Sequence, residues 1–237
     1  PMITGIAGGS NGVAIVTQSR QSATQGVYTG KDSSIKDVKD LKGKRIGLGI
    51  GTFTHKCLIG VLESAGLKEE DVELVNLSTA DEQLSAYESG SIDAFVSNFA
   101  SLYDSLRDGS VVQIVDFSTH PAYTFFVVRR DFIDKYPDIT QRLVNVLVRT
   151  QKWEEENPEE AAKLVAEYTG LGYDAVLELR SKVDLNLQIT DEDKSQIEYT
   201  YNFLKKHDLL ASDIDDLSVV YDDTYIKKAI DTVNQEK

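Results

Sequence analysis

The chain has 237 residues, of which 41% are hydrophobic and 27% charged, a composition typical of a globular protein. Its net charge of −14 disfavours nucleic acid as a partner, because the phosphates would be repelled. No apolar run approaches the roughly 20 residues that span a membrane. The single cysteine, Cys57, excludes a disulfide within the chain, and its place on an apolar helix face favours a buried structural thiol.

The first half of the chain predicts alternating strands and helices. A glycine-rich turn at residues 7–12 leads into a β-branched strand at 12–19, and a polar connector follows. From Arg45 onward, short links between elements predict a parallel sheet covered on both faces. We expect strands at 45–50, 72–77, 92–98 and 111–117, with a helix at about 54–65 that ends before Gly66.

The second half is predicted to be mainly helical. One more strand at 123–132 is followed by a helical pattern that runs to Trp153, which we expect in the core. Pro158 begins another helix, Thr190 caps the next, and residues 222–233 form the last one. These helices have many apolar faces and almost no sheet to cover.

Polar residues crowd the turn between the strand at 45–50 and the following helix. In an open α/β sheet, ligands bind where strands end and helices begin, and free N–H groups at a helix start favour an anion. The hydroxyls of Thr52 and Thr54 can donate to such a ligand, and Gly51 lets the backbone approach it. The alternative is that Thr52 or Thr54 only caps the helix. His55 is either a neutral donor to the ligand or a packing residue.

Two further segments are candidates. At the end of the third predicted strand, Asn98 can donate and accept, and Phe95 or Phe99 can wall an apolar ligand tail. The alternative is an ordinary buried strand, with Asn98 starting the next helix. The glycine-rich turn exposes backbone N–H groups near the end of a strand, or has no further role. The complete set of candidate ligand-binding residues is Gly51, Thr52, Phe53, Thr54, His55, Ser97, Asn98, Phe99, Ser10 and Asn11.

Several stretches, in order over about residues 7–230, carry a family resemblance. They include DVKDLKGKRIGL, GTFTH, LSAYESGSIDAF, FFVVRRDF, WEEENPEEAAKLV and ITDEDKSQIEYTYNFLKKHDLL. With these, the chain resembles the substrate-binding proteins of ABC importers for nitrate, aliphatic sulfonates and taurine, a family that includes thiamine-precursor binders. Members place anion-contacting residues in the loop that corresponds to residues 51–55. The chain departs from the family at 97–100, where many relatives carry a Trp with an acidic residue or Pro.

The resemblance implies an α/β fold of periplasmic-binding-protein type II, with two α/β lobes joined by two hinge strands. Residues 19–123 would form one complete lobe, and residues 1–18 with 124–237 the remainder of the other. The usual opening strands and helices of the family are absent from this sequence, so we expect the N-terminal lobe to be incomplete in this chain.

The resemblance also implies a function. It describes an extracytoplasmic protein, periplasmic or lipid-anchored at the outer face of the cell membrane, that is monomeric when full-length. Such a protein would deliver a small anion, such as a sulfonate, taurine or nitrate, to the membrane subunits of an ABC importer by hinge closure. No catalysis, cofactor or metal is implied.

Two alternatives use related folds. One is a thiamine-pyrimidine-synthase-like enzyme, or a pyrimidine-precursor binder; the enzyme branch carries a cysteine-rich motif that a chain with one cysteine cannot contain. The other is the effector lobe pair of a transcription regulator, against which the long helical C-terminal region argues.

Overall fold

The computed structural model describes residues 2–21, 24–120 and 122–236, and the chain divides into two compact units. Unit 1 comprises Pro1–Arg20, Tyr123–Leu164 and Asp184–Lys237, and unit 2 comprises Gln21–Ala122 and Val165–Val183. Helix α7 (Pro158–Thr169) therefore crosses the boundary between them. The predicted lobes differ from these two units mainly at residues 165–183, which were predicted for the lobe of residues 1–18 and 124–237 but belong to unit 2. The division into two lobes stays a prediction.

Unit 2 contains a mixed sheet with the strand order β4-β3-β5-β2-β6 among its described residues. Strand β3 pairs in parallel with β4 and with β5, whereas β2 runs antiparallel to both β5 and β6. The four predicted strands β3, β4, β5 and β6 thus run in the same direction, as predicted. The sheet as a whole is mixed, because β2 had not been recognised in the sequence. The bounds are β2 Gln25–Gly30, β3 Arg45–Leu48, β4 Glu73–Asn76, β5 Ala94–Asn98 and β6 Val111–Asp116.

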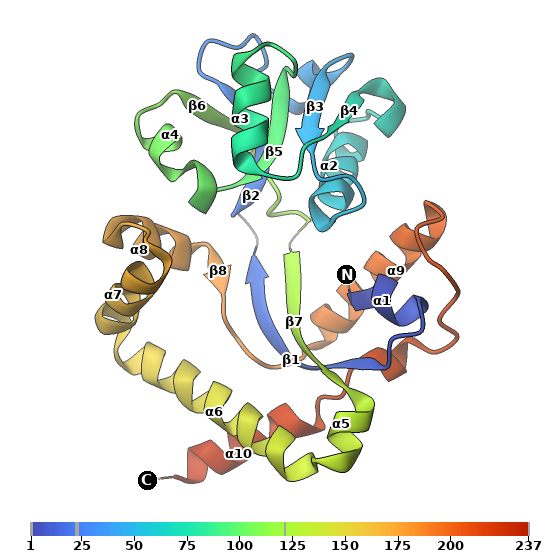
Figure 1. Cartoon of the computed structure of the whole chain (residues 1–237), viewed down its shortest axis with the longest axis vertical. Coiled ribbons are helices and arrows are strands. Elements are labelled where there is room, and N and C mark those ends of the chain that lie inside the picture. Colours follow the sequence, from blue (N-terminus) through green and yellow to red (C-terminus); the bar gives the residue numbers. More distant parts are fainter. Residues whose placement is uncertain (1, 22–23, 121, 237) are drawn as a thin grey trace. The chain divides into compact units, whose positions relative to one another are not determined.

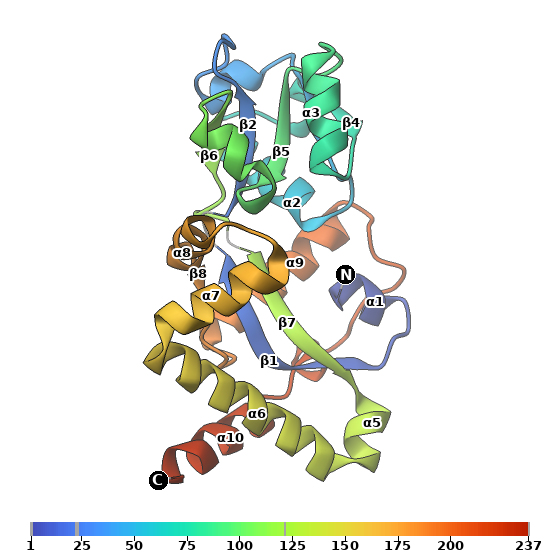
Figure 2. The ribbon, with the colours of Figure 1, turned by 60° about the vertical axis from the view of Figure 1, so that its left-hand side comes forward.

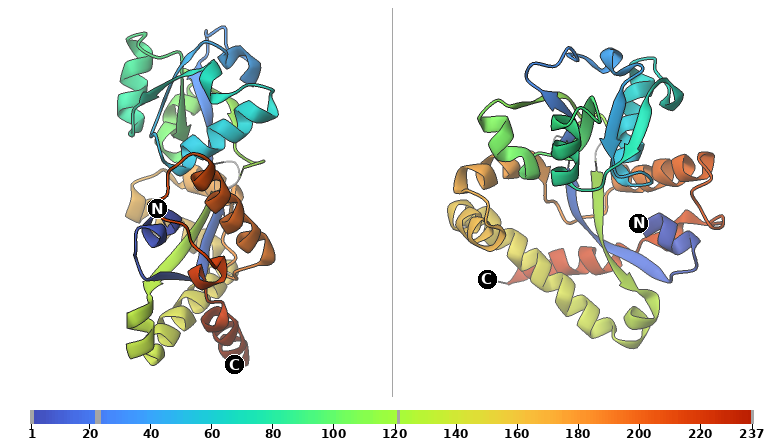
Figure 3. Two further views of the ribbon diagram at one scale, coloured as in Figure 1. Left: turned by 90° about the vertical axis from the view of Figure 1, so that its right-hand side faces the viewer. Right: turned by 45° about the horizontal axis from the view of Figure 1, so that its top comes forward.

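Helices cover both faces of this sheet, as the sequence predicts. Helix α2 (Phe53–Ser64) packs Leu58 and Leu62 against Ile46 and Val96 on one face. Helices α3 (Ala80–Glu88) and α4 (Tyr103–Arg107) cover the other face, around Phe95 (Figure 3, left). Alternate strand residues point to opposite faces, so β5 contributes to both cores. Further elements are η1 Val38–Leu41, η2 Glu69–Asp71, η3 Ala100–Leu102 and α8 Tyr173–Ser181.

Unit 1 is built on the sheet β7-β1-β8, formed by Ala122–Arg129, Gly12–Gln21 and Val183–Asp184, in which β1 and β7 lie side by side (Figure 1). The predicted strand at 123–132 ends three residues early, because helix α5 begins at Arg130. Its helices are α1 Met2–Ala7, α5 Arg130–Lys135, α6 Pro137–Glu156, α9 Asp191–Lys206, η4 Leu217–Val220 and α10 Thr224–Gln235.

The core of unit 1 lies between its sheet and the helices α6 and α10. Val144 and Val148 of α6 pack with Ile226 and Ala229 of α10, and these helices lie side by side in Figure 2. Trp153, on the same helix α6, is 37% exposed, so its prediction as a core residue was wrong. None of the helices in the described ranges is both long and apolar enough to cross a membrane.

A buried ion pair ties helix α9 to strand β1. The Arg20 guanidinium donates to both carboxylate oxygens of Asp193, which is fully buried. Asp193 also accepts hydrogen bonds from Thr17 and from the backbone N–H of Thr190, at 3.2 and 2.7 Å. Because Thr190 is the N-cap of α9, as predicted, this carboxylate joins the cap of the helix to the sheet.

Candidate functional site

A pocket of about 260 Å³ lies within unit 2, at one edge of its sheet. The parallel strands β3, β4 and β5 end at this edge, and the antiparallel strand β2 begins there, with Gln25 opposite Asn98. The strand order therefore brings together residues from four separate parts of the chain. The lining consists of Gln25, Gly49, Thr52, Thr54, Ser78, Ala80, Gln83, Val96, Ser97 and Asn98.

The helix starts at this edge differ in how their N–H groups are satisfied. Helix α3 carries a complete capping box: Thr79 accepts from the N–H of Glu82, whose carboxylate accepts from the N–H groups of Ser78 and Thr79. Those hydrogen bonds lower the pKa of Glu82. Helix α2 has Thr52 as its N-cap, with no side-chain capping bond among the described residues and no acidic residue in its first turn. The start of α2 thus keeps N–H groups and a positive dipole end for an external acceptor.

The hydroxyls of Thr52 and Thr54 form a short chain. Thr52 Oγ1 donates to the carbonyl of Gly49 at 2.6 Å and lies 2.7 Å from Thr54 Oγ1. A threonine hydroxyl has one proton, so Thr54 must donate to Thr52 in this arrangement. Thr52 occupies the N-cap position of α2 but makes no side-chain capping bond among the described residues, and Thr54 lies inside the helix. Neither hydroxyl therefore supplies the cap that the alternative interpretation expected. A ligand oxygen at this position can take the Thr54 proton by rotation of that hydroxyl.

His55 is buried and does not belong to the described lining of the pocket. Its Nδ1 accepts from the N–H of Gly51 at 3.2 Å, which leaves Nε2 as the donor to Glu69 at 3.1 Å. Gly51 has a φ of 75°, a left-handed conformation that glycine adopts without strain. His55 therefore holds the turn before α2 in shape; a direct ligand contact stays a prediction.

The other predicted residues of unit 2 fall into two groups. Ser97 and Asn98 line the pocket, and Asn98 Oδ1 accepts from the N–H of Ser101, which leaves its amide N–H groups as donors. Phe53 and Phe99 do not belong to the described lining. Their rings lie under the ammonium groups of Lys56 and Lys182, at 5.3 and 5.2 Å from the ring centres.

Ser10 and Asn11 belong to unit 1, where each has a local partner. Ser10 Oγ accepts from the N–H of Gly12, and the Asn11 amide donates to Asp131 at 3.2 Å. Their role as ligand contacts stays a prediction. The pocket also contains residues that the sequence analysis did not single out as contacts: Gln25, Gly49, Ser78, Ala80, Gln83 and Val96.

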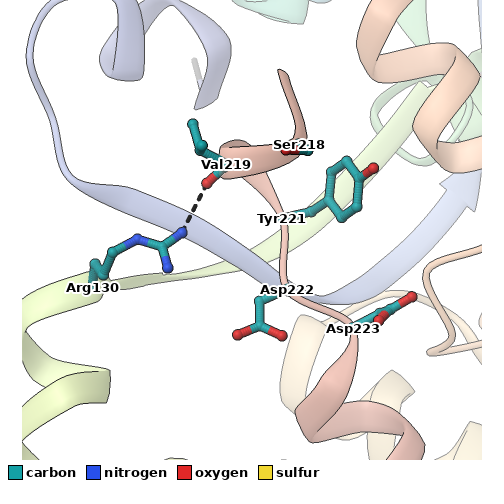
Figure 4. Close-up of a pocket in the computed structure, with 6 residues that line it drawn as sticks. All are labelled: Arg130, Ser218, Val219, Tyr221, Asp222 and Asp223. Carbon is teal, nitrogen blue, oxygen red and sulfur yellow. Dashed lines mark hydrogen bonds between the residues drawn. The ribbon is translucent and has the colours of Figure 1, made fainter. Parts of the chain in front are cut away.

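A shallower depression of unit 1 is a weaker candidate (Figure 4). The Arg130 guanidinium at its edge donates to the carbonyl of Val219 at 2.9 Å. Asp222 accepts from Thr224, and Asp223 pairs with Lys194 and Lys227. The charged side chains of this depression thus already have hydrogen-bond or ion-pair partners within the protein.

Cys57 is fully buried on α2, as predicted, and its thiol donates to the carbonyl of His120. Burial raises the pKa of this thiol to about 12. A thiolate is the nucleophilic form of cysteine, so Cys57 is poorly suited to covalent chemistry.

Comparisons with known proteins agree with this architecture. A family model described as NMT1/THI5 like matches residues 9–161. A relative from Bacillus subtilis (strain 168), whose name assigns it provisionally to the binding of aliphatic sulfonates, is 31% identical over 237 residues. That alignment covers 98% of this chain and 70% of the relative's length.

Two solved structures show the same fold. The periplasmic aliphatic sulphonate binding protein SsuA from Escherichia coli superposes with a TM-score of 0.79 at 20% identity, over 95% of this chain and 78% of that one. The desulfurization enzyme DszB superposes with a TM-score of 0.77 at 19% identity, over 94% and 80%. The chain therefore has the α/β fold of periplasmic binding proteins, a fold that also carries an enzyme.

Proposed function

Since the chain belongs to the NMT1/THI5-like family, we propose that it is a solute-binding protein that carries a small organic sulfonate to an ABC importer. The proposal places the protein outside the cytoplasm, where such an importer collects its substrate. Closure of two lobes about the ligand is part of the proposal and stays a prediction from the family resemblance.

The observation that carries the proposal is the uncapped start of α2 at the edge of a polar pocket. The lining residues that the structure describes carry no charged side chain, and the chain as a whole has a net charge of −14. An anion must then be held by N–H groups, hydroxyls and the helix dipole. A sulfonate suits such a site because its three oxygens accept several hydrogen bonds at once.

Binding without chemistry is favoured over an enzymatic role. The enzyme alternative requires a nucleophile with a general base to activate it, and the described lining contains hydroxyls and carboxamides but no His, Asp, Glu, Lys, Tyr or Cys. Cys57 is buried and the pKa of its thiol is raised. Both ring nitrogens of His55 are already hydrogen-bonded, to Gly51 and to Glu69. We therefore expect the ligand to leave the protein unchanged.

Isothermal titration calorimetry tests the proposal directly. The protein is titrated with ethanesulfonate, propanesulfonate, taurine and nitrate, with inorganic phosphate as a control anion. We expect at least one sulfonate to bind with one-to-one stoichiometry and to be recovered unaltered by mass spectrometry. Absence of binding for every sulfonate, or release of sulfite on incubation, is the result that rejects the proposal.

A further inference from the structure

Glu69 lies outside the described lining of the pocket but is connected to it through His55. It is the first residue of the short helix η2, and its carboxylate accepts from His55 Nε2 at 3.1 Å. The other ring nitrogen, Nδ1, accepts from the N–H of Gly51 at 3.2 Å. His55 thus bridges η2 and the turn that precedes α2.

This bridge requires one tautomer of the His55 imidazole. A neutral histidine has one N–H group and one acceptor nitrogen, and the hydrogen bond at one nitrogen decides which form the other takes. The Glu69 carboxylate only accepts, so it selects the Nε2–H tautomer and leaves Nδ1 to accept from Gly51. Because the His55 side chain is only 8% exposed, the loss of either partner leaves a shielded polar atom unpaired.

The segment that carries Glu69 is itself held in place. The Asp71 carboxylate accepts from the N–H of Lys68 at 2.9 Å and pairs with Lys42 at 3.0 Å. The N–H of Gly43 donates to the carbonyl of Asp71 at 2.7 Å. These contacts join η2 to the residues before β3, so Glu69 presents its carboxylate to His55 from a supported position.

The turn at Gly51 sets the position of the first N–H groups of α2. Gly51 has a φ of 75° and directly precedes the N-cap residue, Thr52. An anion held by these N–H groups is sensitive to their direction, because a hydrogen bond weakens steeply as its angle closes. Donors that are already in place bind more tightly, because no binding free energy is used to order them.

An independent feature of the pocket indicates a ligand at this place. Ser97 is 7% exposed and lines the pocket, and its hydroxyl has no hydrogen-bond partner among the described residues. Its oxygen is not fully shielded from solvent, so a group in the pocket can reach it. Buried polar groups in folded proteins normally have a partner, and here the pocket is where one is expected.

We propose that Glu69 is a positioning residue for the bound anion: by fixing the tautomer of His55, it holds Gly51 and the start of α2 in the form that binds a sulfonate. This inference rests on the proposed function and adds to it a residue outside the pocket. The negative charge of Glu69 acts in the opposite sense, because like charges repel. A variant that keeps the hydrogen bond without the charge therefore separates the two effects.

Two variants of Glu69 and one control test the inference. Glu69→Gln keeps an oxygen that accepts from His55 Nε2, whereas Glu69→Leu has none. Glu70→Leu is the matched control, because Glu70 is exposed and pairs with Lys68. Calorimetry measures the affinities for ethanesulfonate and propanesulfonate. The ¹⁵N chemical shifts of the imidazole nitrogens distinguish the two tautomers, and His55→Gln identifies the signals of this residue among the three histidines.

We expect the wild type, Glu69→Gln and Glu70→Leu to show His55 as the Nε2–H tautomer, and Glu69→Leu to show a mixture of tautomers. The affinity of Glu69→Leu should fall about fivefold, the equivalent of one hydrogen bond, whereas Glu69→Gln should bind at least as tightly as the wild type.

A pure Nε2–H tautomer in Glu69→Leu, or wild-type affinity in that variant, overturns the inference and leaves the proposed function standing. A wild type that binds neither sulfonate while its His55 tautomer depends on Glu69 counts against the proposed function instead. If Glu69→Leu is unfolded by circular dichroism, Glu69→Ala takes its place with the same expectations.

Discussion

Thr54 Oγ1 lies 2.7 Å from Thr52 Oγ1, and Thr52 in turn donates to the carbonyl of Gly49. In this chain of hydroxyls, the Thr52 proton is used in a hydrogen bond within the protein, whereas the Thr54 hydroxyl can rotate and direct its proton elsewhere. The two threonines are adjacent in the pocket but differ in role. Thr52 shapes the turn, and Thr54 is the hydroxyl that can reach a ligand.

Thr54→Val should weaken sulfonate binding about tenfold, which corresponds to the roughly 1.4 kcal/mol of one hydrogen bond to a charged group. Valine has nearly the shape of threonine, so packing should change little. Calorimetry measures the effect, and Thr150→Val on the exposed surface of α6 provides the control. If Thr54→Val binds the sulfonate with wild-type affinity, the Thr54 hydroxyl does not contact the ligand.

Gly26→Ala should destabilise unit 2 by about 1–3 kcal/mol, the usual cost of overpacking. A Cβ at this position would lie 2.3 Å from the backbone oxygen of Val115 in the neighbouring strand β6, which cannot move aside without breaking the pairing. Gly172→Ala is the control, since a Cβ there meets nothing within 4 Å. Urea denaturation, monitored by the labelling of Cys57, measures the stability of unit 2. Equal stability of the two variants would refute the expected clash.

Cys57 should resist alkylation in the folded protein. Its thiol pKa is raised to about 12 by burial, so at pH 9 the native thiol stays protonated while the unfolded one is partly ionised. The free energy of unfolding should therefore decrease as the pH rises above about 9, because only the unfolded state can ionise its thiol there. Iodoacetamide labelling followed by mass spectrometry should be slow in buffer and fast in urea. Rapid labelling of the native protein at pH 8 would show that the thiol is accessible.

Asp193→Ala should destabilise unit 1 by about 1–3 kcal/mol, because Thr17 and the N–H of Thr190 lose a buried acceptor. The same change removes the buried carboxylate beside Arg20, which keeps its ion pair with Asp184. Glu236→Ala, in the same unit, removes an exposed partner of Arg149 and should cost less than about 1 kcal/mol. The single tryptophan, Trp153, lies in unit 1, so its fluorescence during urea unfolding reports on that unit. Similar midpoints for the two variants would argue against the buried pair as an anchor of α9.

Much of the fold could be predicted from local patterns. Strands β3 to β6 and helices α2, α6 and α10 follow the periodicity of their apolar residues, and Gly66 ends α2 with a φ of 79° as its position indicates. Strand β2 was missed because the strand-forming residues of QGVYTG, Val27, Tyr28 and Thr29, are only three in number and lie between two glycines. Its glycines are required by close neighbours, such as the Tyr87 hydroxyl beside Gly30, which lie far away in the sequence.

The candidate site was predicted in part. Thr52 and Thr54 follow strand β3, and Ser97 and Asn98 are the last residues of β5, so the rule for ligand sites at strand ends locates them. Gln83 lies inside a helix, and its one sequence signal is the spacing of four residues from the packed Tyr87, which places an amide on a buried face. Gln25 depends on the antiparallel register of a strand that the sequence did not reveal.

The start of α2 as an anion site can be tested residue by residue. In ¹H–¹⁵N NMR spectra of the protein titrated with ethanesulfonate, the backbone amides of Phe53 and Thr54 should show the largest shifts. The amides of Asp81 and Glu82, in the capped first turn of α3, serve as the internal control and should move less. Shifts that saturate at the first turn of α2 are the predicted result. Unchanged amides at Phe53 and Thr54, with saturable shifts elsewhere or none at all, would contradict the central claim.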